Sequence, residues 1–507
     1  MALFAMWPRE SRLVALLSGQ SGPQGESRWS IFAPVVRTYT DALPAGLIPA
    51  QALVRGETED EPPFIGGYIG YIGYDFAQGL HPQEKMRAAG RAKRSDAERS
   101  GWPMCQMHHC PAALCYDKVT STWHVTGEVG AANLLGAAAV ELWHIMQSPP
   151  ARPAAERALA NLAALGPVSS TWSADGYQSA VRRALELIAR GDIYQVNLTH
   201  TLKGAFSGSA RALMTQLHAH SHAWFGTYLE SPETDGVRRV LCGQSPELFL
   251  RIVPVGKAAA AVSTRPMKGT RARVSTASGG DADGNAATEL LASEKEQAEL
   301  TMIIDLMRND LGRVCVAGSV TATAQRTVEA HGGAGGGLEG GVGEGAVAAG
   351  VWQAVATVAG QVEHERSYAA AVGPLLEATL PGGSITGAPK LRAMQVIDEL
   401  EPHERGPYCG VMGYFSACGR IELAMAIRTA LLTGPRPNPT APDAPDAAGT
   451  PALWMRSHHD RFSGGTLTFP VGAGIVAESD PQAEWEETLL KAGVLQALSQ
   501  TAGPVPT

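Results

Sequence analysis

Two carboxylates and an ammonium group near the C-terminus have a spacing that suits binding of a cation and an anion. Glu484, Glu487 and Lys491 stand at i, i+3 and i+7, so a helix would present all three on one face. Asp480 can cap the start of that helix, and Pro481 fits its first turn. The pattern predicts either a site for a divalent cation with an anionic ligand or a solvated face held by i,i+4 ion pairs.

A further carboxylate, Glu299, lies in the segment LASEKEQAELTMIIDLMRNDLGR, which predicts a helix over about 291–313. Glu299 borders the apolar residues Met302, Ile303 and Leu306. A carboxylate beside such a face either belongs to a ligand site or ends a solvated stripe. Because Mg²⁺ prefers oxygen ligands and retains water, carboxylates from two helices together with an acidic substrate would suit it.

Two glycine-rich stretches could bring backbone close to a ligand. PGGSITGAPK (381–390) runs into the start of a predicted helix, where exposed amide groups favour a carboxylate or a phosphate. Its residue order is not that of a P-loop. GAGIV (472–476) is a second such stretch. Glycine-rich turns are common, so neither stretch alone identifies a ligand.

Two basic residues complete the candidates. Arg428 stands in the apolar stretch AMAIRTALL, which predicts a strand, so its guanidinium needs a carboxylate from either a ligand or a structural ion pair. Lys268 stands in RPMKGTR. An amine held among apolar neighbours can lose its proton and attack an electrophile, although most lysines are simply solvated.

Hydrophobic patterns predict the elements that position these residues. Helical periodicity over 177–190 ends at Gly191, and further helices are expected at about 389–400 and from about Pro481. The predicted strands are IYQVNLTHTL, WFGTYLE, ELFLRIVPV, GVMGYFSA, IELAMAIRTALL, LTFPVGAGIVA and two within FIGGYIGYIGYDF (64–76). Many strands with fewer long helices predict an α+β fold with large sheets. Two segments, 331–350 (rich in Gly) and 434–451 (rich in Pro and Ala), are predicted to be inserted mobile loops.

Composition excludes several classes of protein. A net charge of −8 argues against a general nucleic-acid binder. No run of 18 apolar residues lacks charges or breakers, and the N-terminus lacks the basic start of a signal peptide, so we expect neither a membrane span nor export. Seven cysteines fit a reducing cytoplasm. Three of them, Cys105, Cys110 and Cys115, flank His108 and His109; a zinc site is conceivable there, but the spacing matches no common zinc pattern.

Taken together, the motifs resemble the chorismate-binding family, which includes anthranilate, aminodeoxychorismate, isochorismate and salicylate synthases. The matching stretches occur in family order over roughly 170–500: GDIYQVNL, SPELF, RPMKGTR, ELTMIIDLMRNDLGRV, PGGSITGAPKLRAMQVIDELEP, YCGVMGY, AIRTA and GAGIVAESDPQAEWEETLLKA. The resemblance implies large antiparallel sheets packed as a sandwich with helices on the outer faces. It also implies an N-terminal region over 1–150, marked by GGYIGYIGYD, and a chorismate-binding catalytic region over 171–500.

Three positions separate the branches of the family. Isochorismate and salicylate synthases carry a lysine base where this chain has Gln195. Anthranilate synthases read P-I-A-G-T where this chain has a lysine at 268, the mark of the aminodeoxychorismate synthase branch. Gln353 replaces a histidine thought to help pyruvate leave in the anthranilate branch, and an amide cannot shuttle a proton. Some aminodeoxychorismate synthases keep that histidine, so Gln353 supports the assignment only in part.

The resemblance implies roles for the candidate residues. Lys268 would attack C2 of chorismate while Glu247 protonates the departing C4 hydroxyl, and ammonia would then add at C4 to give 4-amino-4-deoxychorismate, a precursor of 4-aminobenzoate and folate. Mg²⁺ would be held by Glu299 and Glu487, with Glu484 close by. The substrate would contact Gly269, Thr270, Ser384, Tyr408, Arg428, Gly472, Gly474 and Lys491.

The chain has no glutaminase motif, so the resemblance implies a separate glutamine amidotransferase subunit that supplies ammonia. Some relatives bind tryptophan in the N-terminal region; SRWSIFA (27–33) lies roughly where one wall of that pocket would be, but the LLES motif is missing. Two alternatives stay open: an anthranilate synthase component I, and a family member that binds a ligand or partner without catalysis.

Overall fold

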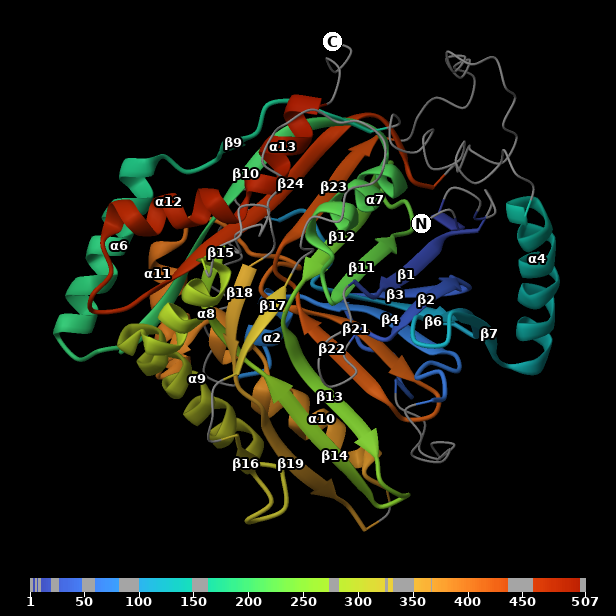
Figure 1. The fold of residues 1–507 in the computed structure, drawn as a ribbon, viewed down its shortest axis with the longest axis horizontal. Helices are drawn as coiled ribbons and strands as arrows, with labels where there is room; N and C mark the ends of the chain where they lie inside the picture. The colour runs from blue at the N-terminus through green and yellow to red at the C-terminus, as the bar shows by residue number, and fades with distance from the viewer. Residues whose placement is uncertain are drawn as a thin grey trace.

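Long antiparallel strands form the framework of the protein (Figure 1). The computed structural model describes residues 3–4, 7, 11–19, 27–47, 60–81, 100–147, 163–272, 282–323, 327–331, 351–365, 367–435 and 459–501. The predicted inserted loops lie outside these residues, apart from His331 and residues 434–435.

Three antiparallel sheets are present in this part of the chain. The twelve-stranded sheet contains β1 (Leu13–Leu17), β2 (Trp29–Pro34), β6 (Ala112–Asp117), β7 (Thr122–Gly127), β8 (Ala163–Leu165), β9 (Ser169–Ser170), β10 (Gln195–Ser209), β11 (Phe225–Glu230), β12 (Val237–Ser245), β20 (Gly387–Ala388), β23 (Thr429–Pro435) and β24 (Arg461–Ile475). The nine-stranded sheet contains β3 (Arg37–Thr40), β4 (Gly67–Ile72), β5 (Cys105–Cys110), β13 (Leu248–Pro254), β14 (Ala259–Arg265), β16 (Thr321–Ala322), β19 (Val358–Glu363), β21 (Val411–Ser416) and β22 (Ile421–Met425). The small sheet contains β15 (Met267–Ala272), β17 (Thr327–His331) and β18 (Val351–Val355).

Helices cover the outer faces of the sheets (Figure 1). They are α2 (Tyr74–Gln78), α4 (Val129–Gln147), α6 (Ala174–Ala189), α7 (Ala210–Ser221), α8 (Ala282–Ala292), α9 (Glu294–Gly312), α10 (Ala369–Thr379), α11 (Lys390–Leu400), α12 (Pro481–Lys491) and α13 (Gly493–Thr501), with the 3-10 turn η2 (Gly383–Ile385). One apolar cluster joins the facing sides of the two large sheets, for example Val14 and Leu229 with Tyr71 and Met412. The predicted α+β sandwich with outer helices is confirmed. No described helix has both the length and the apolar character needed to span a bilayer.

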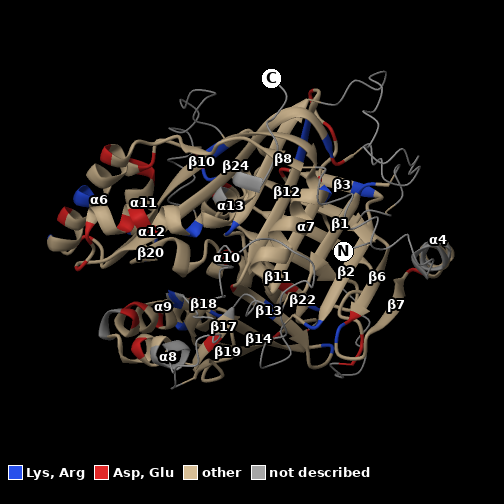
Figure 2. Ribbon diagram, turned by 45° about the horizontal axis from the view of Figure 1, so that its top comes forward, with Lys and Arg blue, Asp and Glu red and all other residues tan. Residues whose placement is uncertain are grey.

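The N-terminal region contributes strands to both large sheets. β1 pairs with β11, and β4 pairs with β21, so strands from the two predicted regions are hydrogen-bonded neighbours. The expected division near residue 150 therefore does not coincide with a boundary between sheets. Charged residues of both signs lie along the outer helices α6 and α9, whereas the strands are mostly uncharged (Figure 2).

Two predicted elements are wrong. Residues 64–76 form one strand, β4, followed by the short helix α2. The strand ends at Ile72. At the next residue, Gly73, a β-carbon would lie 2.6 Å from the carbonyl oxygens of both Gly406 and Met104, and Tyr74 and Ala77 are then buried with helical spacing. The stretch IELAMAIRTALL splits into β22 and β23, which belong to different sheets.

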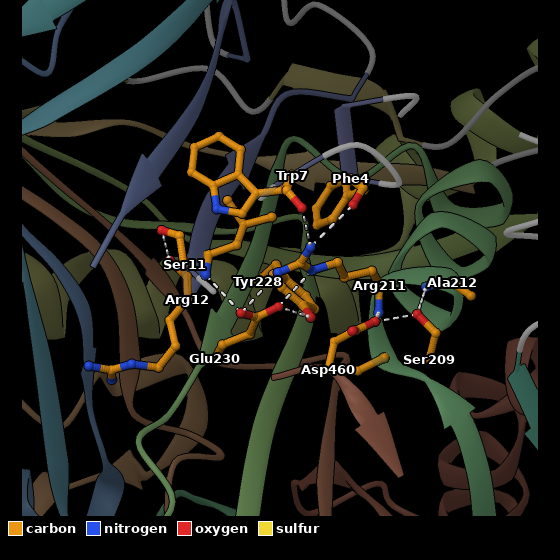
Figure 3. Close-up of polar contacts among 12 residues, drawn as sticks. Phe4, Trp7, Ser11, Arg12, Ser209, Arg211, Ala212, Tyr228, Glu230 and Asp460 are labelled. Carbon is orange, nitrogen blue, oxygen red and sulfur yellow. Dashed lines mark hydrogen bonds and ion pairs between the residues drawn. The ribbon is translucent and has the colours of Figure 1, made fainter. Parts of the chain in front are cut away.

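A buried ion pair fastens the N-terminal segment to this framework (Figure 3). Arg211 of α7 donates from Nε to Glu230 Oε1 at 2.7 Å, and the two side chains are 3% and 0% exposed. Arg211 also donates to the carbonyl oxygens of Phe4 and Trp7 at 3.4 Å each, and the amide of Leu13 donates to Glu230 Oε2 at 2.8 Å. One pair of charges therefore holds both the start of the chain and the first strand.

Replacing Arg211 by Met should lower the free energy of unfolding by about 3–5 kcal/mol, because Glu230 is left as an uncompensated buried charge. Urea denaturation measures the change. The double variant Arg211→Met/Glu230→Leu should recover part of the loss. Arg183→Met breaks only an exposed pair with Glu186 and should stay within about 0.5 kcal/mol of the wild type. Equal losses in Arg211→Met and Arg183→Met would contradict the assignment.

Candidate active site

Two crossings of the chain between the large sheets lie side by side. β12 passes to β13 at residues 246–247, and β22 returns to β23 at residues 426–428. The amide of Met425 donates to the carbonyl of Glu247 at 3.0 Å, and the amide of Gln244 donates to the carbonyl of Arg428 at 2.9 Å. The backbone therefore fixes Glu247 and Arg428 at the same junction between sheets.

Glu247 is a buried carboxyl group, 5% exposed. The hydroxyl of Ser384 donates to its Oε1 at 2.8 Å. Burial raises the pKa of Glu247 to about 7, although the Ser384 hydrogen bond and the positive charge of Lys268 both oppose the rise. Glu247 can therefore hold or release a proton near neutral pH, as a general acid must.

Lys268 lies within the same group of residues, on β15. Its Nζ is 3.8 Å from Glu299 Oε2 on α9, and its side chain is 15% exposed. A β-carbon on Gly474 would lie 3.0 Å from Lys268 Nζ and 2.8 Å from Gln195 Nε2, so the ends of both side chains lie close to the backbone of β24. The amine is thus enclosed by Glu299, Gln195 and the backbone of β24.

The turn after Lys268 depends on another glycine. Gly269 has φ +74°, and a β-carbon there would lie 2.6 Å from Leu290 Cδ1 and 2.8 Å from Glu296 Oε2. The register of β15 against β18 shifts at this point, and Thr270 pairs with Gln353. Gln353 is buried. The side chain of Thr270 lies outside what the structure describes.

Arg428 does not lie in a strand, contrary to the sequence prediction. It occupies the bend between β22 and β23 with φ +53°, a left-handed conformation that a non-glycine residue adopts only when its surroundings hold it. Burial lowers the pKa of Arg428, while Tyr408 and Glu487 favour its charged form. Burial also raises the pKa of Tyr408 well above its usual value. A buried guanidinium with a nearby phenol suits an incoming carboxylate.

Helix α12 has the cap and the face that the sequence predicts. Asp480 accepts from the amides of Gln482 and Ala483, and Pro481 begins the helix. Lys491 Nζ lies 2.7 Å from Glu487 Oε1 and donates to the carbonyl of Gly472 at 2.8 Å. Lys491 therefore joins the helix to the glycine stretch of β24.

The acidic residues of α9 and α12 are candidates for holding a cation. Glu484 is buried and accepts from Ser479 at 2.6 Å, Glu299 faces Lys268, and Glu487 faces Lys491. Among the described residues, no three His, Cys, Asp or Glu side chains lie close enough together to form a preformed metal site. The donors fit Mg²⁺ by their chemistry, because this ion takes one or two carboxylates and completes its shell with water and substrate oxygens.

Near Cys105, Cys110 and Cys115, too, no three His, Cys, Asp or Glu side chains come together among the described residues. All seven cysteines are buried and free, and burial raises the pKa of the Cys105 thiol to about 12. Residues Ser27, Arg28, Trp29 and Ile31 line a pocket together with Trp224 and residues of both large sheets.

His200 supports α12, and sequence reasoning missed it. Its Nε2 is 2.7 Å from the hydroxyl of Thr488, which itself donates to the carbonyl of Trp485, so Nε2 carries the proton. Nδ1 then accepts from Ser170 at 2.9 Å. The ring stacks on Trp485 with centroids 4.6 Å apart. Only the alternation of β10, which turns His200 inward, could have indicated this role.

Comparisons with known proteins agree on the family. The profile described as chorismate binding enzyme matches residues 37–336, 341–438 and 454–497. The chain is 33% identical to an aminodeoxychorismate synthase from Streptomyces griseus over 458 residues, which are 89% of this chain and 52% of that protein. It is 29% identical to anthranilate synthase component 1 from Cereibacter sphaeroides over 450 residues, 88% of this chain and 75% of that protein.

The chain thus spans about half the length of the Streptomyces griseus relative. Among solved structures, anthranilate synthase component I from Streptococcus pneumoniae superposes with a TM-score of 0.65 at 24% identity, covering 94% of this chain and 93% of that one. At this identity the likeness establishes the fold alone. The family resemblance read from the motifs is confirmed.

The support that His200 gives to α12 should depend on pH. Burial lowers the pKa of His200 from 6.5 to about 4, so between these values the unfolded chain binds the extra proton and the folded protein does not. Stability should therefore fall as pH decreases from 6.5 to 4, by roughly 3 kcal/mol from this group. Urea unfolding of His200→Gln should show a shallower fall than the wild type. The exposed His220→Gln should match the wild type, and identical slopes in all three proteins would refute the role of His200.

Proposed function

The chain belongs to the family of chorismate-binding enzymes, and from this premise we propose that it converts chorismate and ammonia to 4-amino-4-deoxychorismate. The product is the precursor of 4-aminobenzoate and, through it, of folate. The observation that carries the proposal is the enclosed amine of Lys268, 3.8 Å from Glu299 and within the electrostatic influence of Glu247. A nucleophile and an acid of suitable pKa thus share one site.

The proposed reaction balances with these two residues. Lys268 reacts as the neutral amine: its nitrogen forms a bond to C2 while the ring double bond shifts and the C4–O bond breaks. Glu247 gives its proton to the departing hydroxyl, which leaves as water. Ammonia then forms a bond to C4, the C2–N bond breaks, and the lysine amine is restored. The carboxylate of Glu247 takes the surplus proton from the new amine.

The remaining residues bind and orient the substrate. Arg428 and Tyr408 would hold one carboxylate of chorismate, with the backbone at Gly472 and Gly474 and the charge of Lys491 beside it. Ser384 keeps Glu247 in place through its hydrogen bond. Glu299 and Glu487, with Glu484 close by, would hold Mg²⁺, which when bound neutralises the ring carboxylate.

Ammonia is proposed to come from a separate glutamine amidotransferase subunit. This part of the proposal follows from the resemblance, because the chain lacks a glutaminase motif. Anthranilate synthase is the second candidate, since a relative of that name is 29% identical over most of this chain. Gln353 disfavours it, because a buried amide cannot carry a proton to departing pyruvate.

Lys268→Ala should abolish formation of 4-amino-4-deoxychorismate from chorismate, Mg²⁺ and ammonium, because no nitrogen remains to attack C2. Mass spectrometry of the products measures this. Lys203→Ala, which removes an exposed lysine on β10, is the matched control and should leave the product unchanged. Fluorescent anthranilate with pyruvate release from the wild type would sink the proposed function. Full product formation by Lys268→Ala would sink the covalent mechanism.

The acid role of Glu247 sets the pH dependence. Since its pKa is raised to about 7, Glu247 carries a proton below this pH and loses it above. The value of kcat/KM should therefore fall as pH rises through about 7. Glu247→Gln cannot donate a proton, so its rate should be about 10²–10⁴-fold lower. Its pH profile should also lack the fall above about pH 7, which is the alkaline limb of the wild-type profile. A wild-type profile without an alkaline limb between pH 6 and 9 would argue against Glu247 as the acid.

A further inference from the structure

Lys390 has an unusual place for a lysine. It is the first residue of α11, where the positive end of the helix dipole disfavours a cation. Its side chain is 8% exposed, and burial lowers the pKa of Lys390. Both effects work against a charged ammonium group here, so specific contacts must compensate for them.

The contacts of Lys390 close a loop. Its Nζ lies 2.5 Å from Asp310 Oδ2 and donates to the carbonyl of Thr379 at 3.0 Å. Thr379 is the last residue of α10, and Lys390 follows directly after residues 380–389. The ammonium group therefore joins the two ends of this loop and fastens the closed loop to α9 through Asp310.

The closed loop holds the partner of the proposed acid. Ser384, at its tip, donates to Glu247. The loop packs tightly on α9, since a β-carbon on Gly383 would lie 2.5 Å from Leu306 Cδ2. Arg405 also donates to the carbonyl oxygen of Ile385 at 2.8 Å.

Helix α9 also carries Glu299, which faces Lys268. Lys390 thus links the element that positions the acid to the element that faces the nucleophile. The other titratable groups around Lys390 are Arg313, which caps the C-terminus of α9, and His81, whose Nε2 is 2.8 Å from the carbonyl oxygen of Leu380.

We propose that Lys390 is a positioning residue for the reaction: by clamping residues 380–389 to Asp310 of α9, it sets the place of Ser384 against Glu247. The inference rests on the proposed function for the role of Glu247. A buried ion pair that served stability alone would leave catalysis untouched once both charges were removed together.

The test removes both charges. In Lys390→Met/Asp310→Leu no buried charge is left unpaired, so the variant should fold. Its kcat for chorismate should fall about 10- to 100-fold with a smaller change in KM, because Ser384 is displaced from Glu247. The fall of activity at alkaline pH should move to higher pH, since the Ser384 hydrogen bond opposes the rise in the pKa of Glu247 that burial causes.

Comparison with Ser384→Ala sharpens the test. Ser384→Ala should shift the limb in the same direction, and adding the double substitution to it should shift the limb no further. Arg392→Gln, at a half-buried position of the same helix whose ion pair is with Glu399, is the matched control and should leave kcat and the pH dependence unchanged.

A folded double variant with wild-type kcat, KM and pH limb would overturn the proposal. If that variant does not fold, Asp310→Asn, which keeps an acceptor oxygen, takes its place with the same measurements. A smaller loss of kcat together with a shift of the alkaline limb to higher pH would support the clamp. Unchanged values of kcat and of the limb would overturn it. The assay follows disappearance of chorismate, so a wild type that forms anthranilate would defeat the proposed function and leave this test intact.

Discussion

The paired crossings between the two large sheets are the constraint on which the site depends. At each crossing the chain leaves one sheet and enters the other, and the two crossings are tied by hydrogen bonds from Met425 to Glu247 and from Gln244 to Arg428. These hydrogen bonds fix the backbones of Glu247 and Arg428, and so place a carboxyl group and a guanidinium at the junction between the two sheets. The left-handed backbone of Arg428 is the local expression of this constraint.

Burial in and around the site works against the charged forms of four side chains, Glu247, Arg428, Lys390 and Asp310. The pKa of Glu247 is raised, and those of Arg428 and Lys390 are lowered. Burial also raises the pKa of Asp310. An arriving substrate carboxylate would stabilise the charged guanidinium of Arg428, because an opposite charge at short range offsets the loss of water. Substrate binding therefore supplies a counter-charge for the buried guanidinium of Arg428.

Local patterns were sufficient for the elements whose signals are contained in a few residues. Asp480, Pro481 and the spacing of Glu484, Glu487 and Lys491 predict α12 and its face, and the structure has both. The strand break at Gly73 and the bend at Arg428 were not predictable from periodicity, because contacts from distant segments cause them. Lys268 could not be distinguished from other lysines by its local pattern, and only the surrounding family motifs indicated its role. Lys390 and His200 gain their meaning only from partners on other elements.

The sharing of both large sheets between the two ends of the chain has a consequence for biosynthesis. When β4 leaves the ribosome, its partner β21 has not yet been made, and at 5–20 residues per second that partner follows only after on the order of tens of seconds. β1 waits in the same way for β11. Newly made N-terminal segments thus present open strand edges to other nascent chains, and safe production of the protein depends on whatever shields these edges until the last strands arrive.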